Sequence, residues 1–258
     1  MTKQTDYQDL VVQRKKCVAC SEKGYLNQAK LGFDTAQIGN YSTWANDLNA
    51  DLMIVAQDFS NHEIYTRDKG RIEPRPLTDA AKANDYSTAT NFYLRELTKL
   101  IGHDIGLPTG NTGRGIFITN AVLCLKPGAM NAANPAPVIT NCGTRFLKPL
   151  VDIVEPEVIV TLGVVPARSV LKAYLVDNPA LVALLKLPFG ELFKQGPIAL
   201  EPKGPLLFPM YHPGRLGQVG RQRAEPNNGS GWVLMQGDWQ RLRAALEQSR
   251  RTGVQPVC

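Results

Sequence analysis

The chain has 258 residues, of which 43% are apolar, and this can fill the core of one or two domains. It contains no apolar run of about 18 residues, and its polar beginning lacks the apolar stretch of a signal peptide, so we expect a cytoplasmic protein without a membrane span. The formal net charge of +6 favours contact with phosphates, although charge alone does not identify a nucleic-acid-binding protein.

Strand-like and helix-like patterns alternate along the chain. Short apolar runs predict four buried strands, at 52–56, 115–122, 158–162 and 206–211. Helical spacing predicts helices at 5–16, 91–101 and 165–175, a helix that Cys142 opens and Pro156 ends, and a closing helix around Trp239. Polar and glycine-rich composition predicts loops at 21–50, 59–90, 126–137 and 220–231. The alternation predicts an α/β fold, a three-layer α/β/α sandwich with a central four-stranded parallel sheet.

Three of the predicted strands end in polar residues. Asp58 follows the first strand, Asn120 lies at the end of the second, and His212 follows the fourth. In open α/β sheets the ligand site lies outside the carboxyl ends of the strands, so we expect these side chains to converge on one pocket. An acid, an amide and an imidazole together suit hydrolysis of a bond to a heterocyclic base.

Each of these side chains also has a purely structural alternative. Asp58 can stabilise a developing cation or position water during hydrolysis, but an aspartate after a strand also suits a helix N-cap. Asn120 offers a donor and an acceptor that can bind the edge of a heterocycle, but it also suits a turn. His212 can donate to an oxygen that becomes an anion, or it can be a histidine satisfied by the backbone.

The chain has five cysteines. Cys17 and Cys20 form a CxxC pair, while Cys124 and Cys142 are widely spaced. In a cytoplasmic chain this pattern favours metal ligands over disulfides. A zinc ribbon would usually supply a second CxxC, so the spacing favours a 4Fe–4S cluster over zinc. Unligated core cysteines are a third alternative. We expect no role for the terminal Cys258.

Several motifs in this order resemble the uracil-DNA glycosylase superfamily. Gln57 and Asp58 stand where these enzymes carry their first motif, His212-Pro213 matches the second, and residues 118–124, ITNAVLC, are similar to a segment of the iron–sulfur branch. The resemblance covers roughly residues 15–245, and further matches to the same branch are Cys142, 146–150 and 155–163.

The resemblance implies a monofunctional, monomeric DNA glycosylase formed by one domain, residues 1–258, in which 1–50 is a cluster-binding segment. It implies that Asp58 activates water, that Asn120 recognises the base, and that Cys17, Cys20, Cys124 and Cys142 hold the cluster. It also places an intercalating loop after the second motif. We therefore expect four residues to contact DNA: Arg215, Leu216, Arg221 and Arg223.

The chain departs from the family around the base pocket. Phe59 and Ser60 follow Gln57-Asp58 where a proline and a tyrosine gate are expected, and an insert at about 61–90 replaces the motif with the stacking aromatic. We expect Gln57, Phe59, Ser60 and Asn120 to bind the base, with Phe59, Tyr65 or Tyr86 stacking on it. The small Ser60 leaves open whether the base is uracil or a bulky C5-modified pyrimidine, which would suit anti-phage defence.

Two other classes of function compete with a glycosylase. The chain could be a non-catalytic DNA-binding or redox-sensing protein that keeps the fold and the cluster, although the presence of Asp58 and His212 argues against this. It could also be a nucleotide-binding α/β enzyme, but no strand-adjacent GxGxxG and no GxxxxGK[ST] motif occurs.

Overall fold

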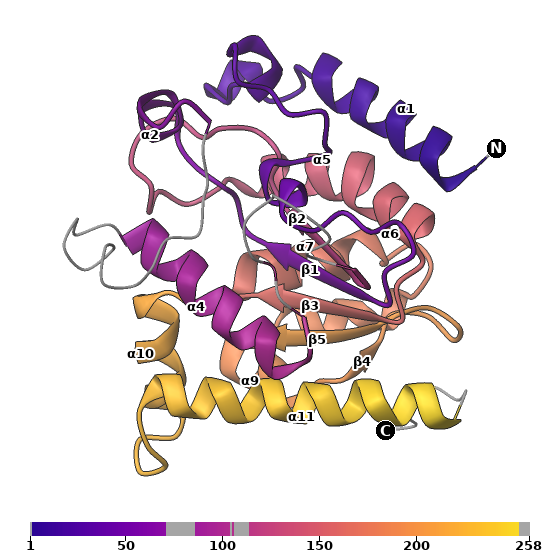
Figure 1. Cartoon of the computed structure of the whole chain (residues 1–258), viewed down its shortest axis with the longest axis vertical. Coiled ribbons are helices and arrows are strands. Elements are labelled where there is room, and N and C mark those ends of the chain that lie inside the picture. Colours follow the sequence, from indigo (N-terminus) through magenta and orange to yellow (C-terminus); the bar gives the residue numbers. More distant parts are fainter. Residues whose placement is uncertain (1, 71–85, 104, 106–113, 253–258) are drawn as a thin grey trace.

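A central, mostly parallel sheet organises the protein, as shown by the computed structural model, which describes residues 2–70, 86–103, 105 and 114–252 (Figure 1). The strand order is β2-β1-β3-β5-β4. The strands are β1 (Leu52–Ala56), β2 (Ile116–Asn120), β3 (Val158–Leu162), β4 (Ile198–Ala199) and β5 (Leu206–Met210). The four expected strands are parallel, and the short β4 adds a fifth that pairs antiparallel with β5. The expected α/β fold is confirmed, with one strand more than predicted.

Helices cover both faces of the sheet. The α-helices are α1 (Lys3–Lys16), α2 (His62–Arg67), α4 (Tyr86–Leu100), α5 (Ala136–Cys142), α6 (Lys148–Val154), α7 (Val164–Ala173), α8 (Val182–Leu185), α9 (Phe189–Lys194), α10 (Arg215–Ala224) and α11 (Gly231–Thr252). Shorter helical turns are η1 (Ser21–Lys23), η2 (Gln28–Lys30), η3 (Asn40–Thr43), η4 (Gly143–Leu147) and η5 (Pro179–Leu181). Among the residues described, every helix is too short or too polar to cross a bilayer.

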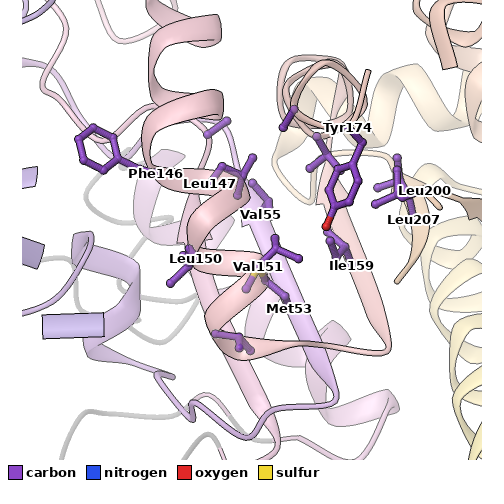
Figure 2. Close-up of a cluster of buried hydrophobic side chains, with 14 of the residues drawn as sticks. Met53, Val55, Phe146, Leu147, Leu150, Val151, Ile159, Tyr174, Leu200 and Leu207 are labelled. Carbon is purple, nitrogen blue, oxygen red and sulfur yellow. The ribbon is translucent and has the colours of Figure 1, made fainter. Parts of the chain in front are cut away.

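The alternation of side chains along β1 builds the three layers. Met53 and Val55 point into a core shared with α1, α6 and α7, and Figure 2 shows them beside Leu150, Val151 and Ile159. Residues of the opposite parity in β1, such as Ile54, face a second core formed with α4 and α11. Figure 1 shows α1 and α6 on one side of the sheet and α4 and α11 on the other. Apolar residues on both faces explain why the strands are continuous apolar runs.

Some predicted boundaries are wrong. Cys142 ends α5 and does not open a helix, because the helical path runs on through the π-helical turn η4 into α6. Helix α2 lies within the stretch 59–90 that was predicted as a loop, and residues 71–85 of that stretch lie outside the described part. Helix α10 occupies part of the predicted loop at 220–231, although its two glycines lower helix propensity. Its packing against α11 outweighs that propensity.

Candidate active site

The three polar strand ends lie along one edge of the sheet, as predicted. Strands β1, β2 and β5 are parallel members of one sheet, and Ala56 pairs with Asn120 in register. Asp58 and His212 each follow their strand by two residues. Burial lowers the pKa of His212, and the negative charge of Asp58 acts in the opposite direction, so these two side chains lie within electrostatic reach of each other.

The carboxylate of Asp58 is held by one of its oxygens. Oδ2 accepts hydrogen bonds from Gln57 Nε2 at 2.9 Å, Lys126 Nζ at 3.1 Å and Asn134 Nδ2 at 2.7 Å. The side chain is only 6% exposed, and no partner for Oδ1 is found among the described residues. The helix that follows β1 is capped by Asn61, whose Oδ1 accepts from the Ile64 N–H. Asp58 is therefore not the N-cap of that helix.

Lys126 and Asn134 are site residues that the sequence did not reveal. Both come from the loop between β2 and α5 and both are buried. Lys126 also donates to the carbonyl oxygen of Ala132 at 3.3 Å, so its ammonium is bound on two sides. Lys126 follows Cys124 by two residues, and nothing in the local sequence shows that its side chain reaches Asp58. Asn134 stands in a loop rich in turn-forming residues, where an asparagine is unremarkable in sequence.

The imidazole of His212 is held in one tautomer. Its Nδ1 accepts a hydrogen bond from the Gly214 backbone N–H at 3.1 Å, so the ring proton of the neutral form resides on Nε2. Burial lowers the pKa of His212 from its ordinary value of 6.5, which favours this neutral form at pH 7. The neutral imidazole therefore keeps Nε2–H as a hydrogen-bond donor that carries no charge.

Asn120 presents a desolvated amide. The residue is 2% exposed, and neither Nδ2 nor Oδ1 has a hydrogen-bond partner within the part of the chain that the structure describes. Asn120 is the last residue of β2, so it does not form a turn. A buried donor and acceptor without partners cost about 1–3 kcal/mol each, and a ligand that pairs with both would recover that cost.

The residues after Asp58 lie deeper than expected for a base pocket. Phe59 is 6% exposed and packs edge-on against Tyr65, with 5.5 Å between ring centroids. Ser60 is buried and its hydroxyl lies 3.9 Å from the sulfur of the half-buried Met130. Ser60 is therefore buried beside Met130.

A further aromatic side chain lies near the carboxylate. Burial raises the pKa of Tyr41, and the charge of Asp58 adds to that increase. The Tyr41 hydroxyl donates to Asn91 Oδ1 at 3.1 Å, and its ring meets Trp44 edge-on. The half-buried Tyr41 is therefore a better stacking candidate than Phe59 and Tyr65, whose rings are buried against each other. The side chain of Tyr86 lies outside the described residues.

The four residues expected to contact DNA divide into exposed and buried ones. Arg215 and Arg223 are exposed on α10, and Leu216, in the first turn of that helix, is 83% exposed. Arg221 is only 2% exposed and pairs with Asp238 at 2.8 Å and with Glu225 at 2.9 Å. The prediction that Arg221 contacts DNA is wrong, because its buried guanidinium is paired with Asp238 of α11 and with Glu225.

Four cysteines lie within electrostatic reach of one another. Burial raises the pKa of Cys124, and the neighbouring thiols of Cys142, Cys17 and Cys20 raise it further. Burial likewise raises the pKa of Cys142 to about 12. Cys258 lies outside the described residues. Across those that are described, no three His, Cys, Asp or Glu side chains form a group that could hold a metal ion.

Hydrogen-bond donors point at several of these sulfurs. Asn141 Nδ2 lies 3.6 Å from Cys20 Sγ, and Arg145 Nη1 lies 3.8 Å from Cys17 Sγ. At Cys142 the Leu123 backbone N–H opposes the rise in pKa that burial causes. Such donors stabilise sulfur in its thiolate form, which is the form that binds metals and iron–sulfur clusters. The donor set therefore fits thiolate ligation chemically.

A comparison with protein families agrees with this geometry. The model of the uracil DNA glycosylase superfamily matches residues 44–228, more than two thirds of the chain. The match includes all three strand-end residues and excludes the CxxC pair. A search of curated proteins finds no match.

Proposed function

The chain belongs to the uracil DNA glycosylase superfamily, and from that premise we propose that it is a monofunctional glycosylase. It would hydrolyse the N-glycosidic bond of a flipped-out uracil or modified pyrimidine in DNA and leave an abasic site. The observation that carries this proposal is the pairing of a clamped carboxylate, Asp58, with a neutral imidazole donor, His212, at the carboxyl edge of the sheet.

Asp58 is the group that acts on the sugar side of the bond. With Oδ2 occupied by three donors, Oδ1 is the atom that can accept a proton from water. The water oxygen then bonds to C1′, and the electron pair of the C1′–N bond leaves with the base. The negative carboxylate also stabilises the positive charge that develops on the sugar.

His212 and Asn120 act on the base side. The Nε2–H of His212 can donate to the base oxygen on which negative charge grows, and one such donor contributes about 3 kcal/mol. A neutral donor suits this role because it stabilises the anion and keeps its own proton. The unpaired amide of Asn120 supplies the donor and acceptor that a uracil-like edge requires.

We also propose that Cys17, Cys20, Cys124 and Cys142 hold a 4Fe–4S cluster, with zinc as the weaker alternative. The mutual electrostatic influence of the four thiols, with N–H donors at Cys20 and Cys17, supports this ligand set. A bound cluster would supply a structural cross-link between the amino-terminal segment and the loops after β2. Anaerobically purified protein should contain about four irons per chain, and stoichiometric zinc without iron would contradict the assignment.

Which base the enzyme removes depends on the side chains around Ser60. The small side chain of Ser60 is buried beside Met130, and a flexible thioether at this position could adapt to bases of different size. This supports a second candidate substrate, a bulky C5-modified cytosine in foreign DNA, beside uracil. Removal of such a base would serve defence against phage.

A matched panel of duplex oligonucleotides tests the function and the base together. The panel contains uracil, thymine, hydroxymethyl-cytosine and glucosylated hydroxymethyl-cytosine at one position, with free base and abasic sites as the readouts. We expect release of uracil or of a C5-modified base, with thymine and unmodified DNA spared. Binding to every duplex without release from any would contradict the glycosylase and favour a non-catalytic DNA-binding protein.

A further inference from the structure

A chain of buried hydrogen bonds connects the cysteine-bearing segment to Asp58. The Tyr25 hydroxyl donates to Asn134 Oδ1 at 2.7 Å, and Asn134 Nδ2 donates to Asp58 Oδ2 at 2.7 Å. Tyr25 is 6% exposed and Asn134 is 7% exposed, so water competes little with either bond. Tyr25 belongs to a small apolar cluster with Cys20, against which Cys124 packs.

The hydroxyl of Tyr25 decides which way the Asn134 amide faces. An asparagine amide has one acceptor oxygen and one donor nitrogen, and a rotation of about 180° exchanges them. Because the Tyr25 proton binds Oδ1, Nδ2 is directed at the carboxylate. Without that hydroxyl, the flipped amide would bring its oxygen against a carboxylate oxygen, which is a repulsive contact.

A second connection runs through the neighbouring residues. Leu26 and Leu125 exchange two backbone hydrogen bonds, of 3.0 and 2.9 Å, and Lys126 follows directly with its ammonium 3.1 Å from Asp58 Oδ2. The backbone of Lys126 is also fixed from the other side, where the His62 N–H donates to its carbonyl oxygen at 3.3 Å. Residues 25–26 therefore support two of the three donors that hold Oδ2.

From this arrangement we infer that Tyr25 and Asn134 are positioning residues for Asp58, and that they make its orientation dependent on the cysteine-bearing segment. The inference rests on the proposed function, in which Asp58 Oδ1 accepts the proton of water. All three donors bind Oδ2, so they fix the rotation of the carboxylate and leave Oδ1 for water. Tyr25 and Asn134 need not touch the DNA.

The test compares two buried tyrosines of the same segment. Tyr25→Phe removes the hydroxyl that orients Asn134, whereas Tyr7→Phe removes one that binds Gln37 Oε1 at 2.7 Å and accepts from the Ile38 N–H at 3.0 Å. We expect Tyr25→Phe to lower single-turnover base release about 10-fold or more, since small misplacements of a reacting group carry costs of that order. Its affinity for the duplex should stay unchanged, and Tyr7→Phe should release base at the normal rate.

A double substitution tests the path itself. If Tyr25 acts through Asn134, adding Tyr25→Phe to Asn134→Ala should lower the rate no further, because the amide that it orients is already gone. A normal rate in Tyr25→Phe, or losses that multiply in the double variant, would overturn the inference.

A measurement without DNA separates this inference from the proposed function. Tyr25 and Asp58 share no hydrogen bond, so a coupling between the stability losses of Tyr25→Phe and Asp58→Asn that disappears in the Asn134→Ala background runs through Asn134. We expect non-additive thermal midpoints for this pair and additive midpoints for Tyr7→Phe with Asp58→Asn. Additive midpoints in both pairs would overturn the inference even if no oligonucleotide of the panel is cleaved.

Discussion

Replacing Gly217 by alanine should displace the imidazole of His212. Gly217 lies in α10, and a Cβ atom at this position would stand 1.9 Å from the His212 carbonyl oxygen, whereas ordinary contact begins at 3.4 Å. The helix cannot simply retreat, because Gly231 at the start of α11 approaches Gln218 equally closely, with a Cβ there 1.9 Å from its carbonyl oxygen. His212 must therefore move by roughly 1.5 Å, and a shift of about 1 Å can cost 10²-fold in rate.

Gly220→Ala is the matched control for this substitution. It lies in the same helix, but its Cβ would meet Tyr211 at 3.5 Å, an ordinary contact. Both substitutions raise helix propensity by about 1 kcal/mol, so propensity does not distinguish them. We expect single-turnover base release to fall about 10²-fold in Gly217→Ala and to stay normal in Gly220→Ala, with duplex binding retained in both. Equal rates in the two variants would refute the argument that α10 positions His212.

Four further predictions follow from the charges of the site and of α10. Burial lowers the pKa of His212 below 6.5, so the neutral imidazole is the donor at and above that pH, and the rate of base release should not decline as the pH rises through 6.5. If the donor were a charged imidazolium, the rate would fall about tenfold per pH unit above its pKa. The lowered pKa of His212 also makes the folded state less stable in acid, because below pH 6.5 the histidine of the unfolded chain binds a proton before that of the folded chain does. The thermal midpoint should therefore fall as the pH drops below 6.5, and His212→Gln should make this fall smaller. Arg223→Gln should reduce the salt dependence of DNA binding by about one unit of slope. Arg221→Met should instead lower the thermal midpoint, because the buried carboxylate of Asp238 then keeps only the largely exposed Arg241 as a partner.

The positions of Asp58, Asn120 and His212 were predictable because they depend on local patterns. A buried parallel strand is a continuous apolar run, and the polar residue after it must lie at the carboxyl edge of the sheet. The strands confirm that reasoning, with Ala56 beside Asn120 in register. The two-residue strand β4 was missed because it is too short to show any pattern.

The clamp on Asp58 was not predictable, because it depends on contacts between distant segments. Lys126 reaches the carboxylate only because its loop pairs with residue 26 on one side and with residues 60–62 on the other. Arg221 was misassigned for a similar reason. Its partner Asp238 lies on the next helix, and a basic residue in an expected loop gives no sign of a buried carboxylate.

In the proposed reaction, Asp58 and His212 carry the hydrolysis of the N-glycosidic bond. Single-turnover base release from the cleaved oligonucleotide of the panel tests it directly, with wild-type protein beside Asp58→Asn and His212→Ala and with duplex affinity measured in parallel. Each variant should lose about 10²-fold or more in rate, because each removes an acid–base or electrostatic group, while affinity persists through the phosphate contacts. Normal base release by both variants would contradict the account and place the chemistry elsewhere in the molecule.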